Sequence, residues 1–256
     1  MPEADLALLE AAARQAGELA FPRAGNPGRV EEKPGGHGPV SETDLAVDRL
    51  LHERLTTARP DYGWLSEETP DRPERLAARR VFVVDPIDGT RAFIAGEKAW
   101  AHALAVIEDG RVIAGVVHLP ALGKTYAAAP GHGARLNGVA IAAATRTDLT
   151  GARLLANGNQ LAPALWPGGV PAVDRNFRPS LAYRLCLVAE GAADATITFR
   201  DTWEWDVAAG ALILAEAGAR ITDRTGQPHR FNAPHPLLPG LIAANPALHA
   251  QILRRL

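Results

Sequence analysis

The stretch VFVVDPIDGTRAF, residues 81–93, places two aspartates three positions apart directly after a run of apolar side chains. The run VFVV predicts a buried strand, because it is short, continuous and rich in β-branched residues. Asp85 ends this run, and Pro86 presets the backbone of the turn that leads to Asp88. Both carboxylates are therefore expected at one edge of a sheet, where two such charges repel one another unless a cation lies between them.

Two other segments supply acidic residues that suit such a site. WLSEET, residues 64–69, carries Glu67 beside Glu68, and WEWDVAAGALILAEAG, residues 203–218, places Asp206 at the front of an apolar helix. Each feature has an ordinary explanation, because Asp-Gly pairs form turns and an acid in the first turn of a helix favours the helix dipole. Their joint occurrence favours one common site.

The ligand types select the ion and the chemistry. Carboxylates without histidine or cysteine at ligand spacing favour a hard cation, which for work on phosphate is usually Mg²⁺. The eight histidines form no HExxH-like pair, which disfavours zinc. Two magnesium ions about 4 Å apart can clamp the attacking water and the leaving oxygen of a phosphate ester. If TRAF, residues 90–93, opens a helix, the backbone N–H groups of Gly89 and Thr90 point at the phosphate, and the Thr90 hydroxyl can orient the water.

The composition of the chain excludes several classes of partner. Its 256 residues are 47% hydrophobic, with 27 basic and 29 acidic side chains and no basic tract, which argues against a nucleic-acid polymer as ligand. The lone Cys186 stands in the apolar stretch LCLVAEG, so we expect a buried thiol in a protein of the reducing cytoplasm. The N-terminus carries Glu3 and Asp5 before any basic residue, unlike a signal peptide, and no apolar run reaches the roughly 20 residues that span a bilayer. We expect no membrane insertion.

Hydrophobic periodicity predicts the elements of the first half of the chain. Residues 1–21 and 41–58 have helical spacing, and the Gly- and Pro-rich segment 22–40 between them predicts a mobile surface loop. From residue 81 onward, short apolar runs joined by Asp-Gly at 109–110 and Asn-Gly at 137–138 predict an antiparallel-rich sheet.

The pattern changes at about residue 145. Beyond it, strand-like and helix-like segments alternate, which predicts a second set of α/β layers. We therefore expect an N-terminal α+β domain, residues 1–145, that holds the antiparallel sheet and most of the metal ligands. A C-terminal α/β domain, residues 146–256, is expected to contribute Asp206 and contacts to the substrate.

The acidic motifs together resemble those of the inositol monophosphatase superfamily of Mg²⁺-dependent, lithium-sensitive phosphomonoesterases. The matching motifs are SEET at 66–69, DPIDGT at 85–90 and WDVAAG at 205–210, and GARLNG at 133–138 fits the same pattern. The resemblance runs from the first helix to the last. It implies a layered αβαβα sandwich of the inositol monophosphatase and fructose-1,6-bisphosphatase type, a small phosphorylated substrate, and a homodimer as one possible assembly.

The resemblance also implies a ligand set of two or three metal ions for each active site. One metal would be bound by Glu67, Asp85 and the backbone carbonyl of Ile87. A second would be bound by Asp85, Asp88 and Asp206.

The same resemblance implies that Asp44, Thr90 and Glu67 form the catalytic set, with Thr90 and Asp44 activating water. Lys33, eleven residues before Asp44, matches a basic residue on the family's mobile loop that helps to close a third, weaker metal site. Other roles stay open for two of these residues. Asp44 is also placed as a capping-box acid three residues after Ser41, and Lys33 as a solvated loop lysine.

Residues near the Trp-Asp pair bear on which ester is hydrolysed. Relatives specific for inositol carry an acidic residue seven positions before that aspartate, whereas this chain has Phe199, whose ring cannot bond to sugar hydroxyls. The CysQ-type 3′(2′),5′-bisphosphate nucleotidases are similar around LCLVAEGAAD and TWEWD, which include Thr202 and Glu204. Arg184 holds the place of a cation that would grip a second phosphate bidentately. The expected substrate contacts are Gly89, Thr90, Arg184, Thr202, Glu204 and Asp206.

The leading interpretation is hydrolysis of adenosine 3′,5′-bisphosphate to AMP and phosphate, a step that clears a by-product of sulfur assimilation. Two departures leave the nucleotide contacts open: Leu181-Ala182 replaces the nucleotidases' serine pair, and Thr198 replaces an arginine. The alternatives are a phosphatase for inositol phosphate or histidinol phosphate. From another class, the alternative is a family member that binds ligands without catalysis.

Overall fold

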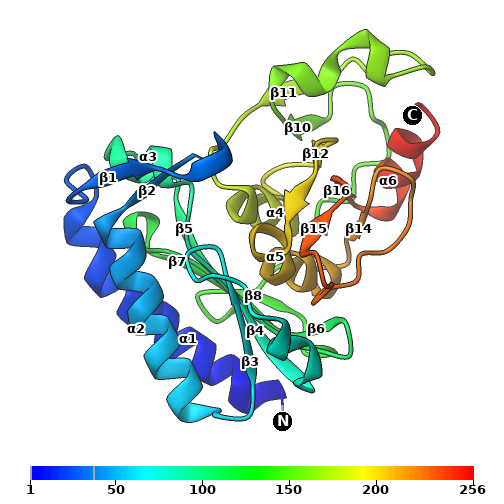
Figure 1. The fold of residues 1–256 in the computed structure, drawn as a ribbon. Coiled ribbons are helices and arrows are strands. Elements are labelled where there is room, and N and C mark those ends of the chain that lie inside the picture. Colours follow the sequence, from blue (N-terminus) through cyan, green and yellow to red (C-terminus); the bar gives the residue numbers. More distant parts are fainter. Residues whose placement is uncertain (1, 37) are drawn as a thin grey trace.

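The fold is a stack of five alternating helical and β-sheet layers in the computed structural model, which describes residues 2–36 and 38–256 (Figure 1). Two helices form the first layer, two lie between the two large sheets, and one covers the outer face of the second sheet. In chain order these helices are α1 (Pro2–Ala20), α2 (Glu42–Ala58), α4 (Leu181–Ala189), α5 (Glu204–Glu216) and α6 (Pro246–Leu253). The expected αβαβα sandwich is confirmed.

The larger sheet has seven strands in chain order, and β3 and β4 form its parallel pair while all other neighbours are antiparallel. Its strands are β3 (Gly63–Ser66), β4 (Arg80–Asp88), β5 (Ala101–Glu108), β6 (Arg111–Leu119), β7 (Lys124–Ala128), β8 (Ala134–Leu136) and β9 (Val139–Ala140). The predicted hairpin turns occur where expected. Asp109 and Asn137 adopt φ of 51° and 50°, a left-handed conformation that Asp and Asn tolerate.

The smaller sheet has five strands in the order β11-β10-β12-β16-β14. These are β10 (Arg153–Leu155), β11 (Asp174–Asn176), β12 (Ala195–Thr198), β14 (Arg220–Thr222) and β16 (Leu241–Ala244). The remaining elements are short: β1 (Val30–Glu32) with β2 (Pro39–Ser41), β13 (Thr202–Trp203) with β15 (Leu237–Leu238), helix α3 (Thr90–Ile94), and 3₁₀ turns at Phe21–Arg23, Pro34–Gly36, Pro73–Ala77, Pro120–Leu122, Gly158–Leu161 and Pro163–Leu165.

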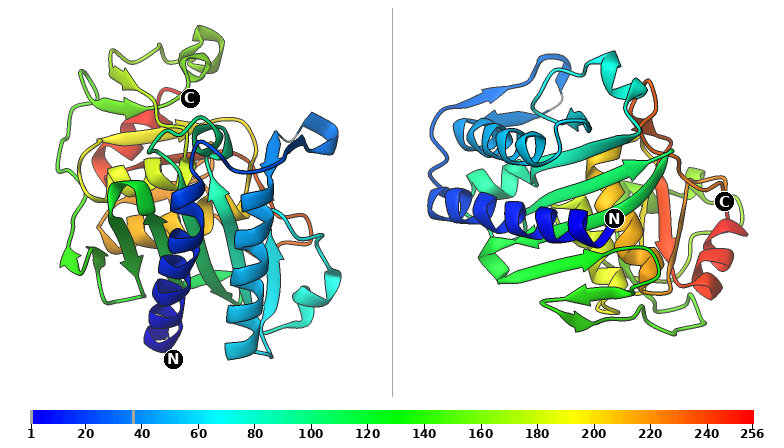
Figure 2. Two further views of the ribbon diagram at one scale, coloured as in Figure 1. Left: turned by 90° about the vertical axis from the view of Figure 1, so that its left-hand side faces the viewer. Right: turned by 90° about the horizontal axis from the view of Figure 1, so that it is seen from below.

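The composition of each helix matches its layer. Helices α1 and α2 lie side by side on one face of the seven-stranded sheet and present one apolar face to it (Figure 2). Helix α5 is apolar almost all round, because it packs between the two sheets, and its buried residues join those of α4 and both sheets in the largest core cluster. Cys186 on α4 is buried in that cluster, as predicted.

Two details differ from the sequence-based expectation. Within segment 22–40, the chain forms the antiparallel hairpin β1–β2, whose strands pair from Val30–Ser41 to Glu32–Pro39; His37 lies outside the described residues. Strand β4 also does not end at Asp85. It continues to Asp88 through a bulge, because Pro86 has no N–H to give to the ladder but is tolerated where pairing is interrupted.

In the described ranges, 2–36 and 38–256, no helix has the length and apolar character needed to cross a membrane.

Gly115→Ala tests how closely α5 must approach the sheet. A Cβ at Gly115 on β6 would lie 2.9 Å from the carbonyl oxygen of Ala209, which is part of the α5 backbone and cannot move alone. We expect a loss of about 1–3 kcal/mol of unfolding free energy, the usual cost of overpacking, measured by urea denaturation. Gly158→Ala is the control, because its Cβ would meet its nearest neighbour only at 3.9 Å. An equal loss in both variants would contradict the explanation.

Candidate active site

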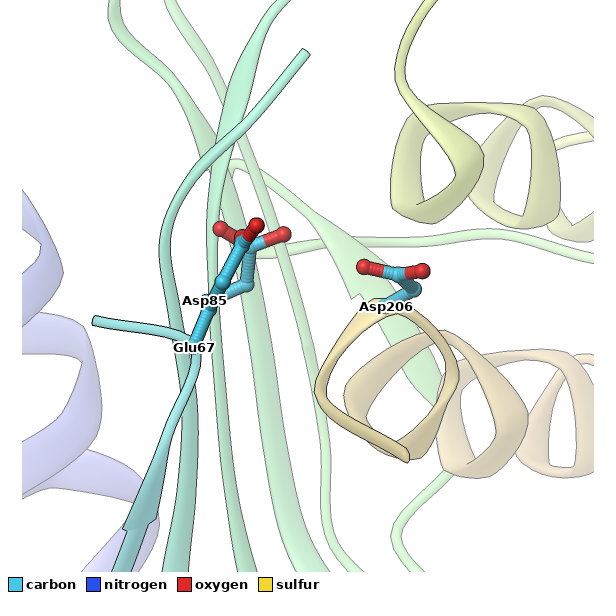
Figure 3. Close-up of side chains that lie close together, drawn as sticks. All are labelled: Glu67, Asp85 and Asp206. Carbon is cyan, nitrogen blue, oxygen red and sulfur yellow. The ribbon is translucent and has the colours of Figure 1, made fainter. Parts of the chain in front are cut away.

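Three carboxylates converge where the seven-stranded sheet meets α5. Glu67 follows the end of β3, Asp85 lies on the parallel neighbour β4, and Asp206 lies in the first turn of α5. One oxygen atom from each lies within 4.8 Å of the others. Figure 3 shows Glu67 and Asp85 pointing from the sheet toward Asp206 on the opposing helix.

The cluster has the properties of a site for a divalent cation. Asp85 is 1% exposed, and its Oδ1 has no hydrogen-bond partner among the described residues. Burial, followed by the charges of Glu67, Asp88 and Asp206, raises the pKa of Asp85 well above its ordinary value. Burial and the charges of Asp88 and Glu67 raise the pKa of Asp206 likewise. A hard cation would satisfy the oxygen and remove the repulsion, and an all-carboxylate donor set suits one.

Asp88 is held by the helix on the far side of the cleft. Its Oδ2 accepts hydrogen bonds from the Ser180 hydroxyl and the Ala182 N–H, both at 2.6 Å. Ser180 also caps α4 by accepting from the N–H of Tyr183 at 3.0 Å. Sequence reasoning missed Ser180, although a serine directly before an apolar helix is an N-cap signal that would have drawn attention to it.

Thr90 joins the acidic segment Asp85–Asp88 at the end of β4, called the acidic loop below, to α2. Its hydroxyl lies 3.1 Å from Asp44 Oδ1 and 3.1 Å from the carbonyl oxygen of Ile87. Gly89, directly before it, has φ of 98°, and a Cβ there would lie 3.2 Å from the carbonyl of Ala99. Glycine is therefore needed at this turn, which begins α3 at Thr90 as predicted.

Asp44 has both contacts that the sequence suggested. Its side chain accepts from the N–H of Ser41 at 3.0 Å and from the Ser41 hydroxyl, and the Ser41 Oγ accepts from the Asp44 N–H, which completes a capping box. Its other oxygen, Oδ1, faces Thr90. Burial raises the pKa of Asp44, although the hydrogen bonds from Ser41 and Thr90 oppose this. The cap therefore also orients the carboxylate toward Thr90, which lines the cleft.

Lys33 reaches the acidic cluster from the hairpin side. Its Nζ lies 2.7 Å from Glu67 Oε1 and 2.7 Å from Glu68 Oε1. Burial alone would lower the pKa of Lys33, but the charges and hydrogen bonds of both glutamates raise it. Burial and the neighbouring charge of Glu67 raise the pKa of Glu68 to about 7, with Lys33 acting in the other direction. Lys33 is thus an ion-pair partner of the cluster rather than a solvated loop lysine.

The cluster opens into a cleft whose far wall is cationic. Arg184 on α4 is 4% exposed, lines the cleft, and lies over the ring of Phe177 with its Cζ 5.5 Å from the centroid. Its Nε has no hydrogen-bond partner among the described residues. The exposed Arg200 lines the same cleft. It was not singled out from the sequence, because the comparison with inositol-specific relatives concerned the preceding position, Phe199.

Three other residues near Asp206 differ in their relation to the cleft, and Glu204 lies off it although it was expected to contact the substrate. Phe199 packs against Trp166 in the core of the smaller sheet, so its ring does not replace a substrate ligand. Glu204 is fully buried, and its carboxylate accepts from the N–H groups of Asn232 and Ala233 at 2.6 and 3.0 Å, which fixes a loop and leaves it off the cleft. Thr202 lines the cleft, and its Oγ1 has no partner in the described part of the chain.

Comparison with known proteins identifies the family. A model described as the inositol monophosphatase family matches residues 2–256. The chain belongs to this family. It is therefore a hydrolase of phosphomonoesters, and its acidic cluster is the place where such a metal-dependent phosphatase could hold its cation.

Named relatives of similar identity act on different esters. The chain is 32% identical to the 3′(2′),5′-bisphosphate nucleotidase CysQ of Aggregatibacter actinomycetemcomitans, over 76% of this chain and 75% of that protein. It is 34% identical to the histidinol-phosphatase of Mycobacterium tuberculosis, over 100% and 99%. Among solved structures, an IMPase from Thermotoga maritima superposes with a TM-score of 0.84 at 28% identity, covering 99% of this chain and 96% of that one.

Asp85→Asn tests whether the cluster is held together at an electrostatic cost. When the pKa of a carboxyl group is higher in the folded than in the unfolded state, the protein becomes less stable as pH rises from about 4 through the folded pKa. In EDTA, the wild type should therefore be less stable at pH 7.5 than at pH 5. The variant should be more stable than the wild type at pH 7.5, by about 1–3 kcal/mol. Thermal unfolding followed by circular dichroism measures both differences.

Mg²⁺ supplies the second arm of this test. It should stabilise the wild type, because it binds the folded state, and should have little effect on Asp85→Asn. A variant that is less stable than the wild type in EDTA would show that the carboxylate stabilises the metal-free fold instead.

Proposed function

We propose that the protein is a Mg²⁺-dependent 3′(2′),5′-bisphosphate nucleotidase that hydrolyses adenosine 3′,5′-bisphosphate to AMP and phosphate. The observation that supports this most is Arg184, a buried cation that lines the cleft beside the acidic cluster and forms no ion pair within the described residues. A metal-dependent phosphomonoesterase uses its metal site for one phosphate, and a cationic wall opposite that site suits a substrate with a second phosphate.

The electrostatics of the wall support an anionic ligand. Burial lowers the pKa of Arg184, the charge of Asp88 opposes that change, and the charge of Arg200 adds to it. Two like charges on one cleft wall are unfavourable without a counter-ion, and an arginine pair grips phosphate through bidentate hydrogen bonds. A substrate with a single phosphate at the acidic cluster would leave this wall without its partner.

Histidinol phosphate is the second candidate substrate. It is favoured by the relative from Mycobacterium tuberculosis, whose identity of 34% extends over the whole of this chain. That substrate carries an amine and an imidazole and no second phosphate, so it gives no role to the cationic wall. The two candidates therefore make opposite predictions for variants of that wall.

Each part of the cleft then has a chemical task. Bound at Glu67, Asp85 and Asp206, with Asp88 and the carbonyl of Ile87 beside them, Mg²⁺ would stabilise the charge that develops on the transferred phosphoryl group. The backbone at Gly89, with no Cβ in the way, lets the phosphate approach the start of α3. We further propose that 1–145 and 146–256 act as the two structural units that meet at this cleft, and that the enzyme works in the cytoplasm.

Proton transfer is assigned to the Asp44–Thr90 pair. The Thr90 hydroxyl donates to Asp44 Oδ1 or to the Ile87 carbonyl, so its oxygen lone pairs are free to accept from an attacking water. As the water gives its proton to the Thr90 oxygen, the Thr90 hydroxyl passes its own proton to Asp44, whose raised pKa makes it a better base.

Asp44→Asn separates the catalytic role of this residue from its capping role. The amide oxygen can still accept from the Ser41 N–H, so unfolding should change by less than about 1 kcal/mol. The amide cannot take up a proton, so kcat should fall by about 10²- to 10⁴-fold. Steady-state kinetics at saturating Mg²⁺ and thermal unfolding measure the two effects. A large loss of stability with unchanged kcat would assign Asp44 to the cap alone.

Substrate choice is tested by comparing kcat/KM for adenosine 3′,5′-bisphosphate, inositol 1-phosphate and histidinol phosphate. We expect the bisphosphate to be preferred by about 100-fold or more, equivalent to about 2.7 kcal/mol of transition-state stabilisation. Arg184→Met and Arg200→Ala should reduce this preference, mostly through KM for the bisphosphate. Arg178→Ala is the matched control, because Arg178 is exposed, bonds to the Phe177 carbonyl, and does not line the cleft. Higher turnover of histidinol phosphate, unaffected by either wall variant, would establish the second candidate.

A further inference from the structure

A buried histidine lies directly beneath the acidic loop. His102 is the second residue of β5 and is 0% exposed, and it shares a face of the sheet with Trp100 and Leu104, which pack against α1 and α2. Asp85 on the neighbouring strand β4 lies on the opposite face of the sheet, the face that packs against helix α5. The imidazole therefore approaches the acidic loop from behind the sheet, away from the cleft.

His102 faces the bulge that separates the two aspartates. In the ladder between β4 and β5, Asp85 pairs with Ala103 and Asp88 pairs with Ala101, so two residues of β4 stand opposite His102. These are Pro86 and Ile87. The Nδ1 atom of His102 is hydrogen-bonded to the carbonyl oxygen of Pro86. A side chain thus makes the cross-strand contact that the backbone ladder omits at the bulge.

The chemistry of this contact fixes the state of the ring. A carbonyl oxygen only accepts, so Nδ1 carries the proton and donates. Burial lowers the pKa of His102 to about 3, so the ring is neutral at pH 7 and Nε2 carries no proton. Nε2 has no partner among the described residues. The unpaired Nε2 is a cost that an apolar side chain at this position would not have. The hydrogen bond from Nδ1 to Pro86 is the one contact that histidine makes here and an apolar side chain could not.

The bulge sets the positions of three expected ligands. Asp85 lies at its start, Asp88 at its end, and the Ile87 carbonyl, which also accepts from Thr90, lies next to the bonded Pro86 carbonyl. Bulges re-aim side chains at functional sites, and groups that hydrogen-bond behind ligands orient them and raise metal affinity.

We propose that His102 is a positioning residue for the metal site: by its hydrogen bond to Pro86 it holds the β4 bulge in the shape that brings Asp85, Ile87 and Asp88 together. The inference rests on the acidic cluster binding a divalent cation, which is part of the proposed function. It does not depend on which phosphate ester is hydrolysed.

The test compares three substitutions that differ in where a donor remains. His102→Asn keeps an N–H donor at the place of Nδ1, His102→Gln moves it to the place of Nε2, and His102→Leu removes it. The probe is Mn²⁺, a hard cation of similar ligand preference, and the concentration of free ion is counted by electron paramagnetic resonance without substrate. We expect Kd to rise about tenfold in the Gln and Leu variants and to stay within about twofold of wild type in the Asn variant.

The control is His118→Leu. His118 pairs with His102 in the β5–β6 ladder and stacks on it at 6.2 Å between centroids, but its Nδ1 bonds to Thr125 and not to the acidic loop. Its loss should leave Kd for Mn²⁺ unchanged. Equal Kd values in all the His102 variants, or an equal rise in His118→Leu, would overturn the proposal. If the Leu variant does not fold, the comparison of Asn with Gln decides. Failure of the wild type to bind Mn²⁺ would instead refute the proposed function.

Discussion

Repulsion among closely spaced carboxylates is the constraint on which the rest of the structure depends. Glu67 and Asp85 are placed side by side by the parallel pairing of β3 with β4, whereas Asp206 comes from helix α5 and has to be brought to them. The apolar contacts of α5 with the seven-stranded sheet supply the energy that does so. The site is therefore a place where packing elsewhere holds charges at separations that they would not adopt alone, which is the usual arrangement for a functional site.

The sequence predicted the elements that carry this site well, and for physical reasons. Continuous β-branched runs mark a strand that is covered on both faces, and β4 is such a strand. A helix that is apolar all round marks an inner layer, and α5 is one. The acidic motifs are short and local, so Asp85, Asp88 and Asp206 could be named before their tertiary arrangement was known.

Contacts between distant segments could not be predicted in the same way. The bond from Ser180 to Asp88 joins residues that are 92 positions apart, and nothing in either segment encodes the other. Glu204 was expected to contact the substrate because TWEWD resembles the nucleotidase motif, but residues two positions apart at a helix start point in different directions, and its carboxylate instead holds the backbone at Asn232. Phe199 and Arg200 show the same limit, because only one of two neighbours lines the cleft.

The ion pairs of Lys33 give the cluster a cation of its own. Its ammonium contacts Glu67 and Glu68 and is tethered through the hairpin β1–β2, so a metal ion that bound through Glu67 Oε1 would compete with a cation whose effective concentration is set by the hairpin. Metal binding would then weaken the attachment of the hairpin by the same free energy by which the attached hairpin weakens metal binding. If a metal ion bound at Glu67, loosening the hairpin would favour that binding, and loading of the site would favour release of the hairpin.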